Sequence, residues 1–362
     1  MSNSNTISVI LTVRNEEQHI GKCLDSIISS ELPDDIILEI VIVDGMSTDS
    51  TRQIIQSKSD SQVDISIVEN VRLNHAHGFN LGIEHSSGQW VVWLGAHSIY
   101  NKSYILGLYN TATKNNTDYC GGVINTLAHD DSYSASVVQA ITTHKFGVGN
   151  SGFRTNATDG PADTASYGMF NRDIFCQIGL FDERLLRAQD YEYNRRIKAN
   201  GGIVWLNPNL VVDYYNQPNL TSFLKKQLLR EAPYNAYMWY LAPYTFSYRH
   251  AITGLFSASL IIGLILSLIF PWIAYAYITI ASIYIALAVY SSISQALRYK
   301  KMLHCLTLPI SFFLYHFLHG VGVVGGIILI AIGKSPVQKI REPWQGYRRF
   351  RVKISGKLNG LL

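Results

Sequence analysis

The chain has 362 residues and a net charge of +4, and only 15% of its residues are charged. This length suits roughly two domains. Residues 251–297 and 303–333 contain no Asp, Glu, Lys or Arg. Such stretches are long enough for bilayer-spanning helices and exclude a wholly soluble chain. No stripe of basic and aromatic residues is found, so no nucleic acid partner is expected.

Strands and helices are predicted to alternate through the first hundred residues. Apolar and β-branched runs predict strands at 7–13, 36–43, 63–68 and 90–94. Asn15 is expected to cap the first helix, and Thr48, Asp49 and Ser50 suit the cap of the second. The order predicts a parallel sheet with right-handed crossovers, which is a Rossmann-like α/β fold.

Polar residues gather where these predicted strands end. The first strand is followed by Thr12–Glu16, the second ends at Asp44, and the fourth leads into Gly95–Ser98. The carboxyl ends of parallel strands share one edge of a sheet, so these residues are expected to line one cleft. Asp44 has two interpretations, a ligand-binding carboxylate or the cap of a turn. No GxGxxG or GxxxxGK[ST] motif is present, which argues against a dinucleotide fold or a P-loop.

Several motifs resemble those of family 2 glycosyltransferases, which have the A-type fold. The resemblance is carried in order by Ser8–Glu16, Val41–Thr51, Leu94–Ser98, Gly168–Arg172, Gly179–Glu183 and Gln189–Glu192. It implies a mixed, mostly parallel sheet and inverting transfer of a sugar from a nucleotide sugar. Together with the apolar segments, the chain resembles the membrane-anchored branch that builds succinoglycan and similar exopolysaccharides.

The resemblance also implies roles for individual residues. Asp190 corresponds to the catalytic base, although an acid there could simply complement a helix dipole. Glu16 also has two interpretations: it contacts the ligand, or it complements the dipole of the helix that follows. The implied substrate-binding residues are Thr12, Arg14, Asn15, Glu16, Asp44, Asn80, Asp163, Gln189 and Glu192.

The chain departs from the family pattern at Gly95. The pattern there is Asp-x-Asp, or Asp-Ala-His in the succinoglycan-like branch, whereas this chain has Gly95-Ala96-His97. His97 is left as the candidate ligand of a divalent cation, and imidazole suits Mn²⁺ better than Mg²⁺. The missing acid leaves three possibilities: weaker metal binding, a metal held mainly by phosphate and water, or an inactive protein.

The apolar segments set the expected domain limits. Residues 1–240 form the predicted glycosyltransferase domain, 241–333 the transmembrane part and 334–362 a basic tail. Spans are expected near 251–270 and 273–293, and 303–333 forms a hairpin or one long span. Lys and Arg on both flanks favour the hairpin and a cytoplasmic catalytic domain at the inner membrane. The N-terminus has no basic region followed by an apolar core, so no signal peptide is expected.

The sequence therefore predicts a membrane-anchored enzyme that uses a nucleotide sugar, with a UDP-sugar preferred as donor. The expected acceptor is a lipid-linked saccharide in exopolysaccharide, capsule or O-antigen assembly. The alternative is a non-catalytic nucleotide-sugar-binding or scaffold protein of the same fold. The four cysteines have no metal-site spacing and are expected to be reduced.

Overall fold

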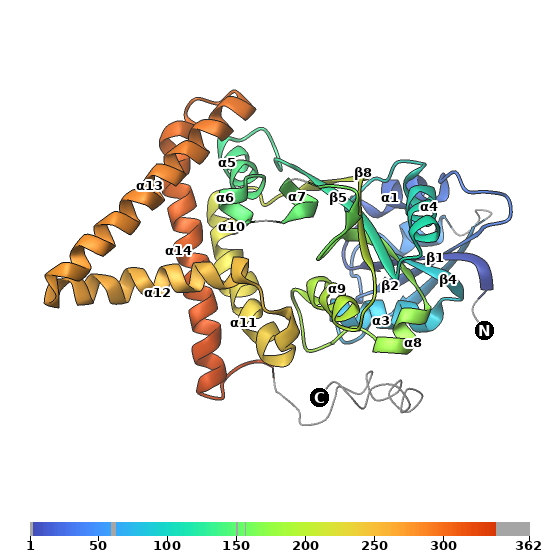
Figure 1. The fold of residues 1–362 in the computed structure, drawn as a ribbon. Coiled ribbons are helices and arrows are strands. Elements are labelled where there is room, and N and C mark those ends of the chain that lie inside the picture. Colours follow the sequence, from blue (N-terminus) through green and yellow to red (C-terminus); the bar gives the residue numbers. More distant parts are fainter. Residues whose placement is uncertain (1–2, 59–62, 150, 156, 338–362) are drawn as a thin grey trace. The chain divides into compact units, whose positions relative to one another are not determined.

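The computed structural model describes residues 3–58, 63–149, 151–155 and 157–337 (Figure 1). These residues form two compact units, which are described separately. The first comprises residues 3–125 and 157–214 of the described chain, and the second comprises residues 126–155 and 215–337.

The first unit is built around a single eight-stranded sheet of the described chain. Its strands are β1 (Asn3–Val13), β2 (Ile37–Asp44), β3 (Asp64–Glu69), β4 (Gly88–Leu94), β5 (Tyr119–Leu127), β6 (Gly160–Pro161), β7 (Ser166–Asn171) and β8 (Val204–Tyr215). Their order is β3-β2-β1-β4-β7-β5-β8-β6. The pairs β1–β2, β1–β4 and β2–β3 are parallel, whereas β4–β7, β5–β7 and β6–β8 are antiparallel. The predicted mixed, mostly parallel sheet is confirmed for the part that carries the strand-end motifs.

Helices connect the strands of this unit. They are α1 (Ile20–Ile28), α2 (Thr51–Gln56), α3 (His75–His85), α4 (Tyr104–Asn115), α8 (Asp173–Ile178) and α9 (Gln189–Ala199). The predicted cap at Asn15 is wrong, because α1 begins at Ile20 and Asn15 has a left-handed backbone with φ of 55°. The amide of Asn15 is instead used to hold a neighbouring turn.

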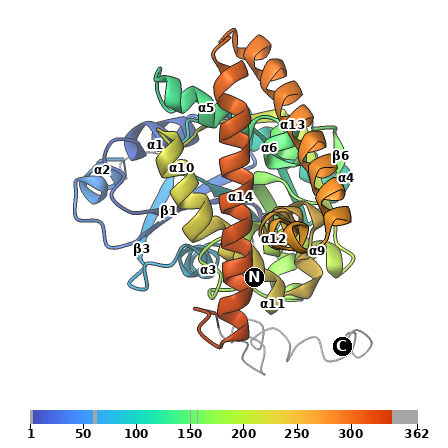
Figure 2. The ribbon, with the colours of Figure 1, turned by 90° about the vertical axis from the view of Figure 1, so that its left-hand side faces the viewer.

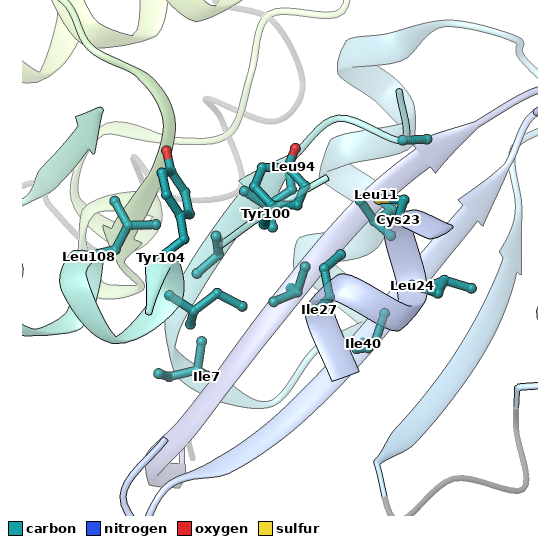
Figure 3. Close-up of a cluster of buried hydrophobic side chains, with 14 of the residues drawn as sticks. Ile7, Leu11, Cys23, Leu24, Ile27, Ile40, Leu94, Tyr100, Tyr104 and Leu108 are labelled. Carbon is teal, nitrogen blue, oxygen red and sulfur yellow. The ribbon is translucent and has the colours of Figure 1, made fainter. Parts of the chain in front are cut away.

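The core of the first unit lies where α1 and α4 pack on the sheet (Figure 3). Ile7 and Leu11 of β1 are fully buried there, and Ile10, which points to the opposite face of the strand, is fully buried too. Burial on both faces is typical of a central parallel strand. Cys23 belongs to this core, and burial raises the pKa of its thiol to about 12. All four cysteines carry free thiols, as expected.

The second unit is helical. Its elements are α5 (Tyr133–Thr142), α6 (Lys145–Val148), α7 (Gly152–Thr155), α10 (Leu220–Lys226), the π-helix η1 (Gln227–Glu231), α11 (Ala232–Leu241), the 3₁₀ turn η2 (Pro243–Thr245), α12 (Tyr248–Ile269), α13 (Pro271–Tyr299) and α14 (His304–Ala331). By length and composition, α12, α13 and α14 are each able to cross a membrane, with 22, 29 and 28 residues. These helices confirm the predicted C-terminal apolar segments.

The hairpin favoured for residues 303–333 is not formed, because α14 is one continuous helix (Figure 2). Its glycines allow close packing instead of a bend. A Cβ at Gly320 would overlap the Thr253 carbonyl of α12, and one at Gly326 would lie 2.9 Å from the Pro233 carbonyl of α11. Small residues in membrane helices commonly permit such approach.

Glycine also permits close strand approach in the sheet, at Gly122 of β5. A Cβ there would overlap the backbone carbonyl of Leu210 in β8.

Gly122→Ala is therefore expected to destabilise the protein by about 1–3 kcal/mol, because the two strands must move apart. The matched control is Gly21→Ala in α1, where a Cβ would meet only Ile54 Cγ2 at 3.4 Å. Thermal unfolding of the two variants measures the difference, and equal midpoints would contradict the close strand approach.

Candidate active site

The ends of β1 and β2 are joined by reciprocal hydrogen bonds between two loops. The parallel register places Val13 opposite Asp44, which brings residues 14–17 beside residues 44–51. The Asn15 N–H donates to Ser47 Oγ at 3.0 Å, and the Thr48 N–H donates to Asn15 Oδ1 at 2.8 Å. The Glu16 N–H donates to Thr51 Oγ1 at 2.7 Å. Asn15 thus acts as a loop-holding residue, and its predicted contact with a nucleotide stays a prediction.

Asp44 has an internal role in this arrangement. Its side chain is fully buried, and its carboxylate accepts from Ser47 Oγ and from Arg52 Nε, both at 2.5 Å. Arg52 also pairs with Glu69 at 2.8 Å, so the guanidinium joins the ends of β2 and β3. With no exposed surface, the carboxylate is used by the turn, which favours the second interpretation of Asp44.

Thr12 is half-buried and Arg14 is exposed at the same edge of the sheet. The Thr12 hydroxyl is 3.0 Å from Nε2 of His75, at the start of α3, and the Arg14 side chain is exposed. The His75 ring packs against Trp93, with 5.2 Å between ring centroids. The sequence does not single out His75, because a single histidine at a helix start carries no recognisable pattern.

Glu16 and His97 are brought together across the strand ends. Glu16 Oε2 lies 3.0 Å from His97 Nδ1, and the two side chains are 12% and 70% exposed. The hydrogen bond with Glu16, together with its negative charge, raises the pKa of His97 above the ordinary value. One carboxylate and one imidazole fit Mn²⁺ in chemical type. Within the described residues no group of three or more His, Cys, Asp or Glu side chains could hold a metal, so phosphate and water would have to complete a coordination shell.

Asn80 is buried and serves the turn at residues 179–183. Its side-chain amide donates to the Phe181 carbonyl at 3.0 Å and accepts from the Phe181 N–H at 3.0 Å. It also donates to Glu183 Oε1 at 3.1 Å. The Asn80 amide therefore supports this turn, and its expected contact with the substrate stays a prediction.

The first turn of α9 presents Asp190 to solvent, next to a half-buried Gln189. The Asp190 carbonyl accepts a hydrogen bond from the side chain of Asn194 at 2.8 Å. Burial raises the pKa of Tyr119 in β5 well above its usual range, and the nearby charge of Asp190 adds to this shift. Asp190 is therefore an accessible acid beside the sheet, as a general base must be.

Glu192 and Asp163 differ sharply in their surroundings. Glu192 is 1% exposed and forms a two-point ion pair with Arg196, at 2.9 and 2.6 Å. Arg196 also donates to the Leu180 carbonyl at 2.7 Å, which ties α9 to the 179–183 turn. Asp163, with a 63% exposed side chain, pairs with Lys198 of α9 at 2.6 Å. Glu192 therefore stabilises the packing of α9 on the 179–183 turn through Arg196. Because its carboxylate is buried in this ion pair, the structure does not support the expected contact with the substrate.

The fold and the order of the strand-end motifs are similar to those of glycosyltransferases with the A-type fold. Residues 8–179 match the family model "Glycosyl transferase family 2".

Two curated relatives and one solved structure illustrate the similarity. The dolichyl N-acetyl-alpha-D-glucosaminyl phosphate 3-beta-D-2,3-diacetamido-2,3-dideoxy-beta-D-glucuronosyltransferase of Methanococcus voltae is 28% identical over 90% of this chain and 98% of its own length. Succinoglycan biosynthesis protein ExoA of Rhizobium meliloti is 22% identical over 59% of this chain and 64% of its own. The mannosyltransferase PcManGT from Pyrobaculum calidifontis, solved with GDP-Man and Mn²⁺, superposes with a TM-score of 0.54 at 17% identity, covering 91% of this chain and 88% of that chain. This last likeness concerns the fold.

The difference in burial between Glu192 and Asp163 allows a test of whether Glu192 stabilises the fold or binds substrate. Glu192→Gln leaves the buried Arg196 without its counter-ion, which is expected to cost about 3–5 kcal/mol and lower Tm by roughly 6–20 °C. The control, Asp163→Asn, removes exposed ion pairs, which are worth about 0–1 kcal/mol. Thermal unfolding of the full chain in detergent measures both. A loss of donor affinity in Glu192→Gln at unchanged Tm would return this residue to the substrate site.

Proposed function

We propose that this protein is an inverting glycosyltransferase that moves a sugar from a nucleotide sugar to a lipid-linked saccharide. The observation that carries the proposal is the exposed Asp190 at the start of α9, in a chain with a family 2 glycosyl transferase domain. An in-line displacement at the anomeric carbon needs a base for the acceptor hydroxyl proton, and a solvent-accessible carboxylate supplies one.

The donor is proposed to bind at the carboxyl ends of β1, β2 and β4. The exposed Arg14 offers positive charge there, and the Thr12 hydroxyl offers a hydrogen-bonding group. A UDP-sugar is the donor favoured from the sequence, and the GDP-Man of the PcManGT complex makes GDP-sugars the second class to test.

A divalent cation is proposed as cofactor, held by His97 and Glu16, which lie 3.0 Å apart. Such a cation would neutralise negative charge on the departing diphosphate. The Mn²⁺ of the PcManGT complex supports the choice of Mn²⁺ over Mg²⁺, as does the imidazole donor.

The acceptor and the cellular location are proposed from the membrane helices and from the relatives. The printed name of the Methanococcus voltae relative includes a dolichyl phosphate, and that of ExoA includes succinoglycan biosynthesis. We place residues 1–240 in the cytoplasm as the catalytic domain and 241–333 in the inner membrane. If α12 and α13 cross as a pair, the basic segment Arg298–Lys301 lies on the same side as the residues before α12, which suits the cytoplasm. Exopolysaccharide, capsule or O-antigen assembly is the proposed setting.

A non-catalytic scaffold of the same fold is the second candidate, favoured by the absence of an acid at Gly95. The two candidates differ in one reaction that can be measured. The enzyme releases a nucleoside diphosphate from the donor, whereas the scaffold does not.

The proposal is tested with Asp190→Asn in the full chain. Turnover of a nucleotide sugar, read as release of UDP or GDP in the presence of Mn²⁺ and a membrane lipid extract, should fall by about 10²–10⁴-fold. Donor affinity should be retained, because the substitution removes the base and keeps the shape of the side chain. The control is Asp173→Asn, which removes another exposed acid from the first turn of a helix, α8.

An equal loss of turnover in Asp190→Asn and Asp173→Asn would indicate that Asp190 only complements the helix dipole. Donor binding with no turnover in the parent protein would favour the scaffold.

The proposed role of His97 in holding a divalent cation leads to a separate prediction. Chelation of divalent cations should weaken donor binding, and His97→Ala should raise the Mn²⁺ concentration needed for half-maximal donor binding by roughly tenfold or more. The control is His85→Ala at the end of α3, whose Nδ1 bonds to the Leu81 carbonyl. Unchanged Mn²⁺ dependence in His97→Ala would remove His97 from the cation site.

A further inference from the structure

The end of β4 is held in a fixed position at Gly95. The Gly95 N–H donates to the hydroxyl of Tyr100 at 2.8 Å, and the same hydroxyl donates to the Gly95 carbonyl at 2.9 Å. Tyr100 is 4% exposed and belongs to the core of Figure 3. The backbone of residue 95 therefore cannot move aside easily to make room for a side chain.

The space where a side chain at residue 95 would begin is already occupied by Tyr167. A Cβ on Gly95 would lie 3.0 Å from Tyr167 Cε1 and 3.6 Å from its hydroxyl oxygen. Carbon atoms at optimal separation lie about 3.5–4.0 Å apart, so any side chain at residue 95 would push the ring away. The Tyr167 ring can therefore occupy this position only because residue 95 is a glycine.

Tyr167 is itself held firmly. It lies in β7, which runs antiparallel to β4 with Val92 opposite Met169, so the start of β7 meets the end of β4. Its carbonyl accepts a hydrogen bond from the buried Tyr104 hydroxyl at 2.7 Å. Its φ of 48° lies in the left-handed region, which costs a bulky residue of order 1–3 kcal/mol and persists only when the surroundings enforce it.

The phenol and a carboxylate differ in what they offer a ligand. A carboxylate at this strand end would add a negative charge and an acceptor beside Glu16 and His97, whereas a phenol is neutral below a pKa of about 10 and both donates and accepts. Sugar and ribose hydroxyls also donate and accept, so a phenol is a suitable partner for them.

We propose that the half-buried Tyr167 phenol takes the place that an acidic side chain at residue 95 would occupy, and hydrogen-bonds a hydroxyl of the nucleotide-sugar donor. Tyr167 is then a donor-binding residue. This inference rests on the proposed function, because it assigns a contact within the donor site of that function.

The experiment is a titration of full-length protein in detergent, with Mn²⁺, by UDP, GDP and their sugar derivatives. Tyr167→Phe keeps the ring and removes the hydroxyl, so donor affinity should fall by about 3–10-fold, as for one neutral hydrogen bond. The control, Tyr109→Phe, removes a hydroxyl from a ring that packs edge-on against Trp90 in the same unit, and should bind as the parent does. Thermal unfolding of each variant shows that it is folded.

A second variant tests the coupling of the two positions. Gly95→Ala should displace the ring and weaken donor binding to a similar degree, while Gly95→Ala in the Tyr167→Phe background should add little. Non-additivity of this kind is expected of residues in contact. Fully additive losses would overturn the idea that Gly95 acts through the phenol.

The ligands separate the two sources of the hydroxyl. Equal weakening for the nucleoside diphosphate and the nucleotide sugar assigns the hydroxyl to the ribose, and weakening for the nucleotide sugar alone assigns it to the sugar. Either supports the proposal. Parent-like affinity of Tyr167→Phe for every ligand would overturn it while leaving the proposed function intact. Failure of the parent to bind any of these ligands would overturn both.

Discussion

The parallel pairing of β1 with both of its neighbours is the constraint on which the site depends. Leu11 lies opposite Leu94 of β4, and Val13 lies opposite Asp44 of β2. This register delivers three loops to one edge of the sheet. A slip of one residue would turn every buried side chain of β1 to the other face, so core packing and site geometry are fixed by the same alignment.

Many polar groups near this edge are used to hold loops in place. Asp44 is paired with Arg52, Glu192 is paired with Arg196, and Asn80 bonds to the backbone of Phe181. Buried charges of this kind are tolerated because each has a partner with good geometry. The groups left accessible to a ligand include Arg14, His97 and Asp190, and these differ in charge and chemistry. Internal pairs thus hold the loops, while a smaller set of polar side chains stays exposed.

The fold could be predicted from sequence because its signals are local. Strand runs, their order and the polar residues at strand ends lie within short windows, and the structure places β1 to β4 within a few residues of expectation. The division between exposed and buried polar residues could not be predicted, because it depends on distant partners. Glu183 bonds to Asn80 from more than 100 positions away, and no sequence motif indicates that pairing.

The hairpin expected in residues 303–333 is wrong for a related reason. Glycine permits either a bend or close helix packing, and only the neighbours of α14 decide between them.

The close contact between Gly95 and Tyr167 has an evolutionary consequence. A side chain introduced at residue 95 meets the ring at 3.0 Å, whereas loss of the ring alone leaves an opening at the strand end with nothing to fill it. Either single change therefore passes through a less favourable intermediate, and the two positions are expected to be inherited as a pair. A carboxylate at this strand end is therefore expected to be accommodated best when residue 167 changes together with residue 95, although the two lie on different strands.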